Sequence, residues 1–375
     1  MKFEDILLFW EVLKPILFIV FIIAASIQIL YYLFFYLRVF TLKPKKSIDN
    51  IFEPVSVIVA AHNEYDNLKK NLPLILEQNY PEFELILIND RSEDATEQLI
   101  AGFQEKYKNL RYTFIKNNGK LRHGKKLAIT LGVKASKYEN ILLTDADCQP
   151  STANWISEMM KGFSSSDIVL GYGPYSQKNT FINKIIRYDT LFIAMQYLSF
   201  AKAGIPYMGI GRNLAYKKEI FVKNKGLSSH AHLRSGDDDL FINEVANSNN
   251  TAIVIDPESF VYSEPEATFK DWIWQKKRHL TTFNRYKNKH KLLLGTEVFS
   301  RELFYILALS LLNNYYNNYI FIILIIIRIL LLIISLSYAT ILFKEPRLKI
   351  FIILLDFLLP FLNFCVHLIY PKPKR

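Results

Sequence analysis

Long apolar runs lie towards both ends of the chain. Residues 15–37 contain no charged side chain, and residues 320–343 and 350–370 contain only Arg328 and Asp356. At about 1.5 Å per residue in a helix, each run is long enough to cross a bilayer. A shorter apolar run begins at Leu303. The first run is too long for a cleaved signal peptide and lacks a small-residue cleavage site, so it predicts a membrane anchor.

Between these runs, stretches of strand length alternate with stretches of helical periodicity. The predicted strands are 55–61, 83–90, 111–116 and 140–147, and the predicted helices are 66–78, 92–107 and 124–136. The first strand, VSVIVAA, is a continuous apolar run typical of a strand covered on both faces. Ser92 is the expected N-cap of the second helix. This alternation predicts an α/β fold with a mostly parallel sheet and right-handed crossovers.

The change in composition divides the chain into three parts. We expect an N-terminal transmembrane anchor over residues 1–47, a soluble domain over residues 48–291 and C-terminal transmembrane helices over residues 292–375. No repeat or Gly/Ser-rich linker interrupts the middle part, which has the size of one large domain. The number of C-terminal membrane crossings stays open. The basic segment 371–375 would lie on the cytoplasmic side for some numbers of crossings and on the opposite side for others.

The charge distribution indicates which side of a membrane the soluble domain faces. The formal net charge is +11, and basic residues gather beside the apolar runs. Lys and Arg beside a span mark the cytoplasmic side, so we expect an integral membrane protein, of the inner membrane if the source is bacterial, whose soluble domain lies in the cytoplasm. Anionic headgroups explain these charges without a nucleic-acid partner. The two cysteines, Cys148 and Cys365, form no disulfide framework, which agrees with a reducing compartment.

Acidic residues follow the predicted strands at the edge where α/β sheets bind ligands. Glu64 follows the first strand, Asp90 ends the second, and Asp145 and Asp147 end the fourth. Side chains alternate along a strand, so Asp145 and Asp147 are expected to point the same way. Two neighbouring carboxylates suit a divalent cation such as Mg²⁺ or Mn²⁺. The alternative is a D-x-D that only caps a strand in a polar turn.

Seven motifs occur in an order that resembles a known enzyme family. They are VSVIVAAHNE (55–64), LILINDRSEDAT (85–96), HGKKLAI (123–129), ILLTDADC (141–148), YMGIGRNLAYKK (207–218), SGDDDLF (235–241) and QKKRH (275–279). Over residues 53–290 this pattern resembles the family 2 glycosyltransferases, which are inverting enzymes of GT-A fold. The last motif resembles the Q-x-x-R-W motif of membrane-bound members, among them cellulose, chitin and hyaluronan synthases and ceramide glucosyltransferases.

The resemblance implies a nucleotide-sugar donor, which we expect to be a UDP-sugar. A metal held by Asp145 and Asp147 would neutralise the leaving diphosphate. Lys125 begins a helix and would add positive charge beside the phosphates, although a solvated surface lysine is the alternative. The donor-binding residues implied are Glu64, Asp90, Lys125, Asp145, Gln275 and Arg278. The acceptor-site residues implied are Gly211, Arg212 and His279.

An inverting transfer also needs a base that takes the proton of the acceptor hydroxyl. In SGDDDLF, glycine or aspartate replaces the glutamate of the family's E-D-x-x-L motif. Alignment on Leu240 makes Asp237 the base, whereas alignment on the first acidic pair makes it Asp238. We favour Asp237 and keep Asp238 as the alternative. One of the three aspartates is expected to be a helix N-cap.

His279 stands where the family has a tryptophan, so the acceptor and processivity do not carry over. Together with Trp272, Phe283 and Tyr286 it recurs at helix-like intervals among many basic residues. This pattern predicts an amphipathic helix that lies on the lipid headgroups, with a core-facing helix as the alternative.

Three residues have plainer expectations. Cys148 is expected to be a small packing residue. Arg328 and Asp356 lie inside predicted spans, where charge is costly, so they are expected to pair with each other or to face a polar cavity.

Other enzyme classes fit the sequence less well. A dinucleotide-dependent oxidoreductase needs G-x-G-x-x-G after its first strand, and residues 60–67 contain no glycine. A P-loop fails because Lys126 stands where Ser or Thr should bind the metal. A non-enzymatic membrane nucleotide-binding protein would need degenerate acidic sites.

The sequence therefore predicts a membrane-bound glycosyltransferase of cell-envelope glycan synthesis. The few C-terminal spans favour transfer to a lipid or lipid-linked acceptor. The alternative is a processive polysaccharide synthase of the same family.

Overall fold

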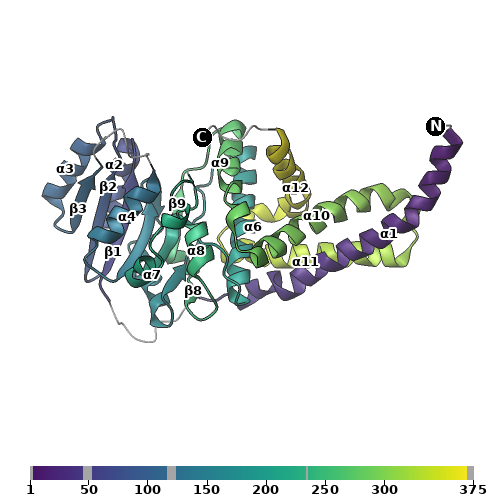
Figure 1. Ribbon diagram of the computed structural model, residues 1–375, viewed down its shortest axis with the longest axis horizontal. Coiled ribbons are helices and arrows are strands. Elements are labelled where there is room, and N and C mark those ends of the chain that lie inside the picture. The colour runs from purple at the N-terminus through teal and green to yellow at the C-terminus, as the bar shows by residue number, and fades with distance from the viewer. Residues whose placement is uncertain (1–2, 45–52, 116–123, 234, 370–375) are drawn as a thin grey trace. The chain divides into compact units, whose positions relative to one another are not determined.

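The computed structural model describes residues 3–44, 53–115, 124–233 and 235–369, and the chain forms two compact units (Figure 1). One unit comprises Met1–Thr41 and Lys287–Arg375, and the other comprises Leu42–Tyr286. The domain boundary expected between residues 47 and 48 lies outside the described residues. The second division falls after Tyr286, slightly earlier than the expected end at residue 291.

The unit Leu42–Tyr286 is built on a seven-stranded sheet with the order β3-β2-β1-β4-β7-β6-β8. Its first four strands are parallel neighbours, and β7 runs antiparallel to both β4 and β6. The mostly parallel α/β sheet expected from the sequence is confirmed. The strands are β1 (Val55–Ala61), β2 (Phe83–Asn89), β3 (Leu110–Phe114), β4 (Asn140–Asp145), β6 (Ile168–Leu170), β7 (Leu214–Lys217) and β8 (Thr251–Ile253). A separate antiparallel pair joins β5 (Cys148–Pro150) to β9 (Val261–Ser263).

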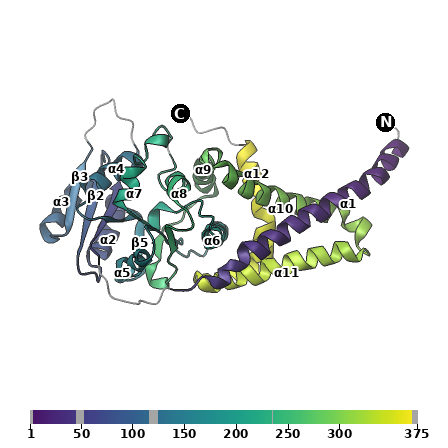
Figure 2. The same ribbon diagram turned by 60° about the horizontal axis from the view of Figure 1, so that its bottom comes forward.

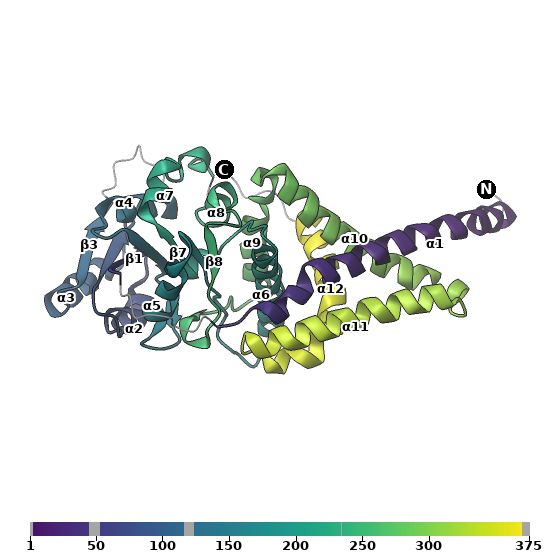
Figure 3. The ribbon, with the colours of Figure 1, turned by 90° about the horizontal axis from the view of Figure 1, so that it is seen from below.

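Helices cover both faces of this sheet. Figures 2 and 3 show α4 and α7 on one face and α2 and α5 on the other. The helices of the unit are α2 (Tyr65–Leu76), α3 (Thr96–Lys106), α4 (Lys125–Ala135), α5 (Trp155–Met160), α6 (Phe181–Lys202), α7 (Lys218–Lys223), α8 (Asp239–Val245) and α9 (Phe269–Leu280). The helices cover the two faces of the sheet but not the edge at the carboxyl ends of the parallel strands. In α/β sheets this edge is where ligands bind.

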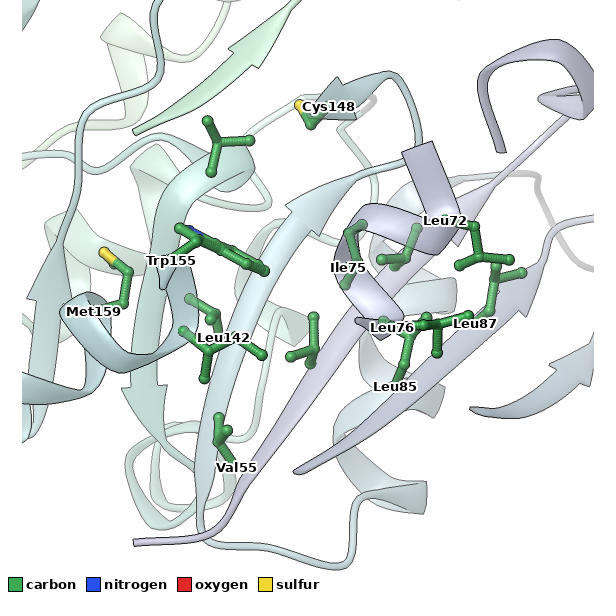
Figure 4. Packing of buried hydrophobic residues seen from close by; sticks show 14 of the residues in the cluster. Val55, Leu72, Ile75, Leu76, Leu85, Leu87, Leu142, Cys148, Trp155 and Met159 are labelled. Atoms are coloured by element: carbon green, nitrogen blue, oxygen red, sulfur yellow. The ribbon is translucent and has the colours of Figure 1, made fainter. Parts of the chain in front are cut away.

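The core follows from the period of two in the strands. Alternate residues of β1, β2 and β4 pack with Leu72, Ile75 and Leu76 of α2 and with Trp155 of α5 in one buried cluster (Figure 4). On the opposite face, α4 approaches the sheet at Gly132, where an added Cβ would lie 2.6 Å from the Ile58 side chain. Both faces of the central strands are thus buried, as expected for a parallel sheet.

The expected N-cap of α3 is wrong. The helix begins after Ala95, and the Ser92 hydroxyl instead accepts a hydrogen bond from the Asn63 amide at 2.9 Å. Asn63 and Arg91 both have positive φ, 57° and 58°, just beyond the ends of β1 and β2. The two loops therefore bind each other, and this contact takes Ser92 away from the helix.

The unit Met1–Thr41 with Lys287–Arg375 is helical. It contains α1 (Phe3–Phe34), α10 (Asn288–Tyr315), α11 (Tyr319–Leu342) and α12 (Ile352–Ile369). Among the described residues, two segments are long and apolar enough to cross a membrane, Glu11–Thr41 and Tyr319–Leu342. α1, α10 and α11 share an apolar cluster that includes Phe21, Phe304 and Phe321.

A buried ionic network lies inside this helical unit. Arg328 of α11 contacts Asp356 of α12 at 2.7 Å, and both side chains are fully buried. Arg301 of α10 lies 3.5 Å from the same carboxylate, and Tyr305 donates a hydrogen bond to it at 2.5 Å. The expected pair of Arg328 with Asp356 is therefore present, and it joins three helices.

Helix α9 differs from the headgroup helix that the sequence suggested. Trp272 is buried inside the unit Leu42–Tyr286, and Tyr286, which lies beyond the end of α9, is buried as well. Lys276 donates to both carboxylate oxygens of Asp189 on α6 at 2.8 Å, with both side chains largely buried. The face carrying Trp272 thus packs into the domain, as in the core-facing alternative.

Candidate active site

The two aspartates of the D-x-D motif converge beyond the end of β4. Asp145 is the last residue of β4, and Asp147 lies in the turn before β5. Strand alternation therefore does not set the direction of Asp147, but one ligand atom each from Asp145, Asp147 and Cys148 lie within 4.8 Å of one another. Burial, and then the neighbouring Asp145 carboxylate, raise the pKa of Asp147. Two neighbouring carboxylates are hard oxygen donors of the kind that Mg²⁺ and Mn²⁺ prefer.

Cys148 lies closer to this site than its expected packing role suggested. Its Sγ lies 3.0 Å from the Ser263 hydroxyl and donates to the Asp147 carboxylate at 3.4 Å. Burial, and then the charge of Asp147, raise the pKa of the thiol. The thiol therefore remains protonated and holds one carboxylate oxygen of Asp147. Its place directly after the motif was the signal in the sequence.

Lys125 connects the D-x-D motif with the downstream acidic run. Its Nζ lies 2.6 Å from Asp145 Oδ1 and 3.3 Å from Asp237 Oδ2. Desolvation opposes the charged form, but Asp145 and Asp237 together raise the pKa of Lys125 well above its ordinary value. α4 begins at this residue, and Gly124 before it has an extended backbone. Two motifs some ninety residues apart thus meet at one ammonium group.

The three consecutive aspartates point to different partners. Asp238 is the N-cap of α8, and its Oδ2 accepts a hydrogen bond from the Gly211 amide at 2.6 Å. Asp239 accepts hydrogen bonds from the Thr282 and Tyr286 hydroxyls at 2.5 and 2.8 Å. Asp237 is paired with Lys125. The expected N-cap is present, and each carboxylate has a distinct environment.

These environments separate the proton affinities of Asp237 and Asp238. Burial alone would raise the pKa of Asp237, but the Lys125 ammonium lowers it below its usual range. Burial, followed by the charges of Asp237 and Asp239, raises the pKa of Asp238 to about 7. Asp237 is therefore a fixed anion, whereas Asp238 exchanges a proton near neutral pH.

Arg212 lies beside the D-x-D motif, and its guanidinium packs on Tyr175, a contact that the sequence did not predict. Its guanidinium carbon lies 4.3 Å from the centre of the Tyr175 ring, and its charge acts on Asp147. A Cβ at position 173 would lie 2.7 Å from the Arg212 side chain, so Gly173 permits this position. Tyr175 donates from its hydroxyl to Gln275 Oε1 at 3.4 Å. Tyr175 belongs to none of the recognised motifs, and no local pattern marks it.

Asp90 and Glu64 lie at the ends of neighbouring strands, as expected. Asp90 Oδ1 accepts two hydrogen bonds from Arg91, at 2.8 and 2.9 Å, and Oδ2 accepts from the Gly124 amide at 3.1 Å. Glu64 accepts from Asn67 at 2.7 Å. Burial raises the pKa of Glu64, and Asp147 and Asp145 add to the shift, so Glu64 lies within electrostatic range of both. Arg91 was missed by sequence reasoning.

Arg278 and His279 lie on α9 with exposed side chains, and the Arg278 carbonyl accepts from Ser235 at 3.1 Å. His279 lies within electrostatic range of Arg278, Lys276 and Asp237. Direct contacts thus join Lys125 to Asp145 and to Asp237, and a hydrogen bond joins the Gly211 amide to Asp238.

Part of the chain is similar to known glycosyltransferases. Residues 56–224 match the family model described as Glycosyl transferase family 2. This segment is less than half of the chain, and it is similar to that family. The matched segment contains the D-x-D motif, Lys125 and Arg212, whereas the acidic run and α9 lie beyond it.

The matched relatives are longer than the shared region. A poly-beta-1,6-N-acetyl-D-glucosamine synthase of Staphylococcus epidermidis is 34% identical over 27% of this chain and 24% of its own length. The probable glycosyltransferase YdaM of Bacillus subtilis is 27% identical over 62% of this chain and 55% of its own length. The chain thus spans between a quarter and about half of these two relatives.

Among solved structures, the mannosyltransferase PcManGT from Pyrobaculum calidifontis, in complex with GDP-Man and Mn²⁺, has the same fold. The two chains superpose with a TM-score of 0.60 at 18% identity, over 92% of this chain and 98% of that one. The unit Leu42–Tyr286 therefore has the GT-A fold.

Proposed function

We propose that the protein is a membrane-bound, metal-dependent inverting glycosyltransferase that uses a nucleotide sugar, expected to be a UDP-sugar. One observation carries the proposal: Lys125 joins Asp145 of the metal-type site to Asp237 of the acidic run. This contact brings the groups suited to a diphosphate and the groups suited to proton transfer into one centre. Such a pairing is what sugar transfer from a nucleoside diphosphate requires.

Asp145 and Asp147 are the residues that would hold Mg²⁺ or Mn²⁺. A bound divalent cation supplies Lewis-acid neutralisation of the leaving diphosphate. Lys125 and the first turn of α4 add positive potential at the same place. Arg212, held over Tyr175, faces the charge of Asp147. Asp90 and Glu64, at the ends of β2 and β1, complete the donor side.

For the base we now favour Asp238 over Asp237. A general base works best when its pKa is near the working pH, and the pKa of Asp238 is about 7. Asp237 is ionised but engaged by Lys125, which weakens it as a proton acceptor. The Gly211 amide donates a hydrogen bond to Asp238 Oδ2, and the Asp239 amide donates one to Oδ1. The acceptor hydroxyl would approach this carboxylate.

The proposal has two forms, which differ in the acceptor of the sugar. Transfer to a lipid or lipid-linked acceptor at a bacterial inner membrane fits a soluble unit attached to few candidate spans. Processive polymer synthesis is the second candidate, because one matched relative is named a poly-beta-1,6-N-acetyl-D-glucosamine synthase. In both cases the soluble unit would face the cytoplasm, where nucleotide sugars are made.

The test uses membranes that contain the full chain. They are incubated with a panel of radiolabelled UDP- and GDP-sugars plus Mn²⁺, and lipid and polymer fractions are extracted separately. We expect label from one donor in the lipid fraction, and none with Asp145→Ala or Asp147→Ala. Label in long polymer alone would select the processive alternative. Undiminished labelling in both alanine variants would contradict the metal assignment.

A further inference from the structure

The Lys125 ammonium lies on a carboxylate that a divalent cation would need. Asp145 Oδ1 is 2.6 Å from Lys125 Nζ, within the range of a strong charge-assisted hydrogen bond. The same Asp145 contributes to the cluster with Asp147 and Cys148. A cation bound to Asp145 would therefore lie close to the ammonium, and the two like charges would repel each other.

The lysine is placed so that it is able to move. Its side chain remains 37% exposed and is shared between Asp145 and Asp237, which are 30% and 11% exposed. The Lys276–Asp189 pair of the same unit gives a contrast, because both of its side chains are only 11% exposed and the ammonium contacts both oxygens. Lys276 is thus a closed structural pair, whereas Lys125 is an open one on a flexible side chain.

A bound diphosphate would change which anion the Lys125 ammonium contacts. It carries the negative charge that an ammonium and a divalent cation both attract, and Lys125 starts α4, where helix amides also favour anions. With a diphosphate present, the ammonium has a new anionic partner in addition to Asp237 and is able to leave Asp145. Without it, an ammonium that leaves Asp145 keeps only Asp237, and the cation meets a positive charge that no phosphate screens.

We propose that Lys125 is an internal counter-ion that keeps a bare divalent cation off Asp145 and gives way only when a nucleoside diphosphate arrives with the cation. The inference rests on the proposed function and adds the order of binding to it. It makes Lys125 a residue with two effects of opposite sign. Lys125 weakens the binding of the metal alone, and it strengthens the binding of the metal–nucleotide complex.

The experiment measures Mn²⁺ binding to the purified full chain in detergent, by electron paramagnetic resonance of free Mn²⁺, with and without UDP or GDP. The variants are Lys125→Met and Lys125→Gln, of which the second keeps a hydrogen-bond donor without the charge. Lys134→Met is the matched control, because Lys134 is exposed on the same helix. Circular dichroism verifies that each variant is folded.

We expect both Lys125 variants to bind Mn²⁺ alone about tenfold more tightly than wild type or more, in the usual range of coupling between sites. The same variants are expected to bind the nucleotide more weakly at saturating Mn²⁺, while Lys134→Met matches wild type in both measurements. Unchanged or weaker binding of Mn²⁺ alone in a folded Lys125 variant would overturn the inference. If wild type binds no nucleotide with Mn²⁺, the proposed function fails instead, and the comparison with metal alone still decides the role of Lys125.

Discussion

The replacement of Asp238 by asparagine is the sharpest test of the proposed chemistry. The change keeps the size of the side chain and a hydrogen-bond acceptor for the Gly211 amide, which contacts Oδ2 at 2.6 Å. It removes the carboxylate that would accept the proton, and the amide of asparagine is unable to accept it. We therefore expect Asp238→Asn to lower kcat by about 10²–10⁴-fold, the usual contribution of a positioned base.

The pH dependence gives this prediction a sign and a midpoint. Asp238 must be ionised to accept a proton, and its pKa is raised to about 7 by burial and by Asp237 and Asp239. At saturating Mn²⁺, kcat/KM of the wild type should fall about tenfold per pH unit below the midpoint and level off above it. Asp237→Asn removes a charge that raises the pKa of Asp238, so it should move the midpoint to lower pH and retain turnover.

The assay is initial-rate transfer of labelled sugar between pH 5.5 and 8.5, with nucleotide affinity measured in parallel. We expect Asp238→Asn to bind nucleotide as wild type does. A flat wild-type profile over this range would contradict the assigned pKa. Loss of transfer in Asp237→Asn together with normal transfer in Asp238→Asn would show that the alignment on Leu240 was right and that the argument for Asp238 fails.

Three further predictions concern the metal site and two buried ion pairs. Asp147→Asn should weaken Mn²⁺-dependent nucleotide binding at least about tenfold, because it removes one of two hard oxygen anions, and titration calorimetry measures it; equal binding would exclude Asp147 as a ligand. Lys276→Met leaves Asp189 buried without its ammonium and should cost about 3–5 kcal/mol of stability, whereas Lys276→Met with Asp189→Leu should recover much of it in thermal unfolding; a single variant as stable as wild type would refute this. Arg328→Asp should destabilise the helical unit in detergent, and the charge swap with Asp356→Arg should restore part of the loss; no rescue would mean that the contact at 2.7 Å contributes little.

The prediction of Ser92 as an N-cap was wrong, whereas the prediction of Asp145 at the end of a strand was right. The two outcomes show where reasoning from sequence succeeds. Apolar periodicity predicted β1 to β4 and α2 to α4 to within a few residues, because burial of a whole face leaves little choice of register. It predicted none of the shorter strands and helices between β4 and β9. Caps depend on single hydrogen bonds, so a loop contact with Asn63 was enough to take Ser92 from α3. The D-x-D motif was found because strand ends in an α/β sheet meet at one edge.

The sequence by itself determined that this protein has an α/β domain with acidic groups at the carboxyl ends of its strands, flanked by apolar helices. These properties follow from local periodicity and residue chemistry, which the chain states directly. Only the tertiary structure decided which acid meets which cation. The contacts of Lys125 with Asp145 and Asp237, and of Arg212 with Tyr175, join separate segments of the chain. Such contacts set proton affinities through distance and burial, and no linear pattern encodes either quantity.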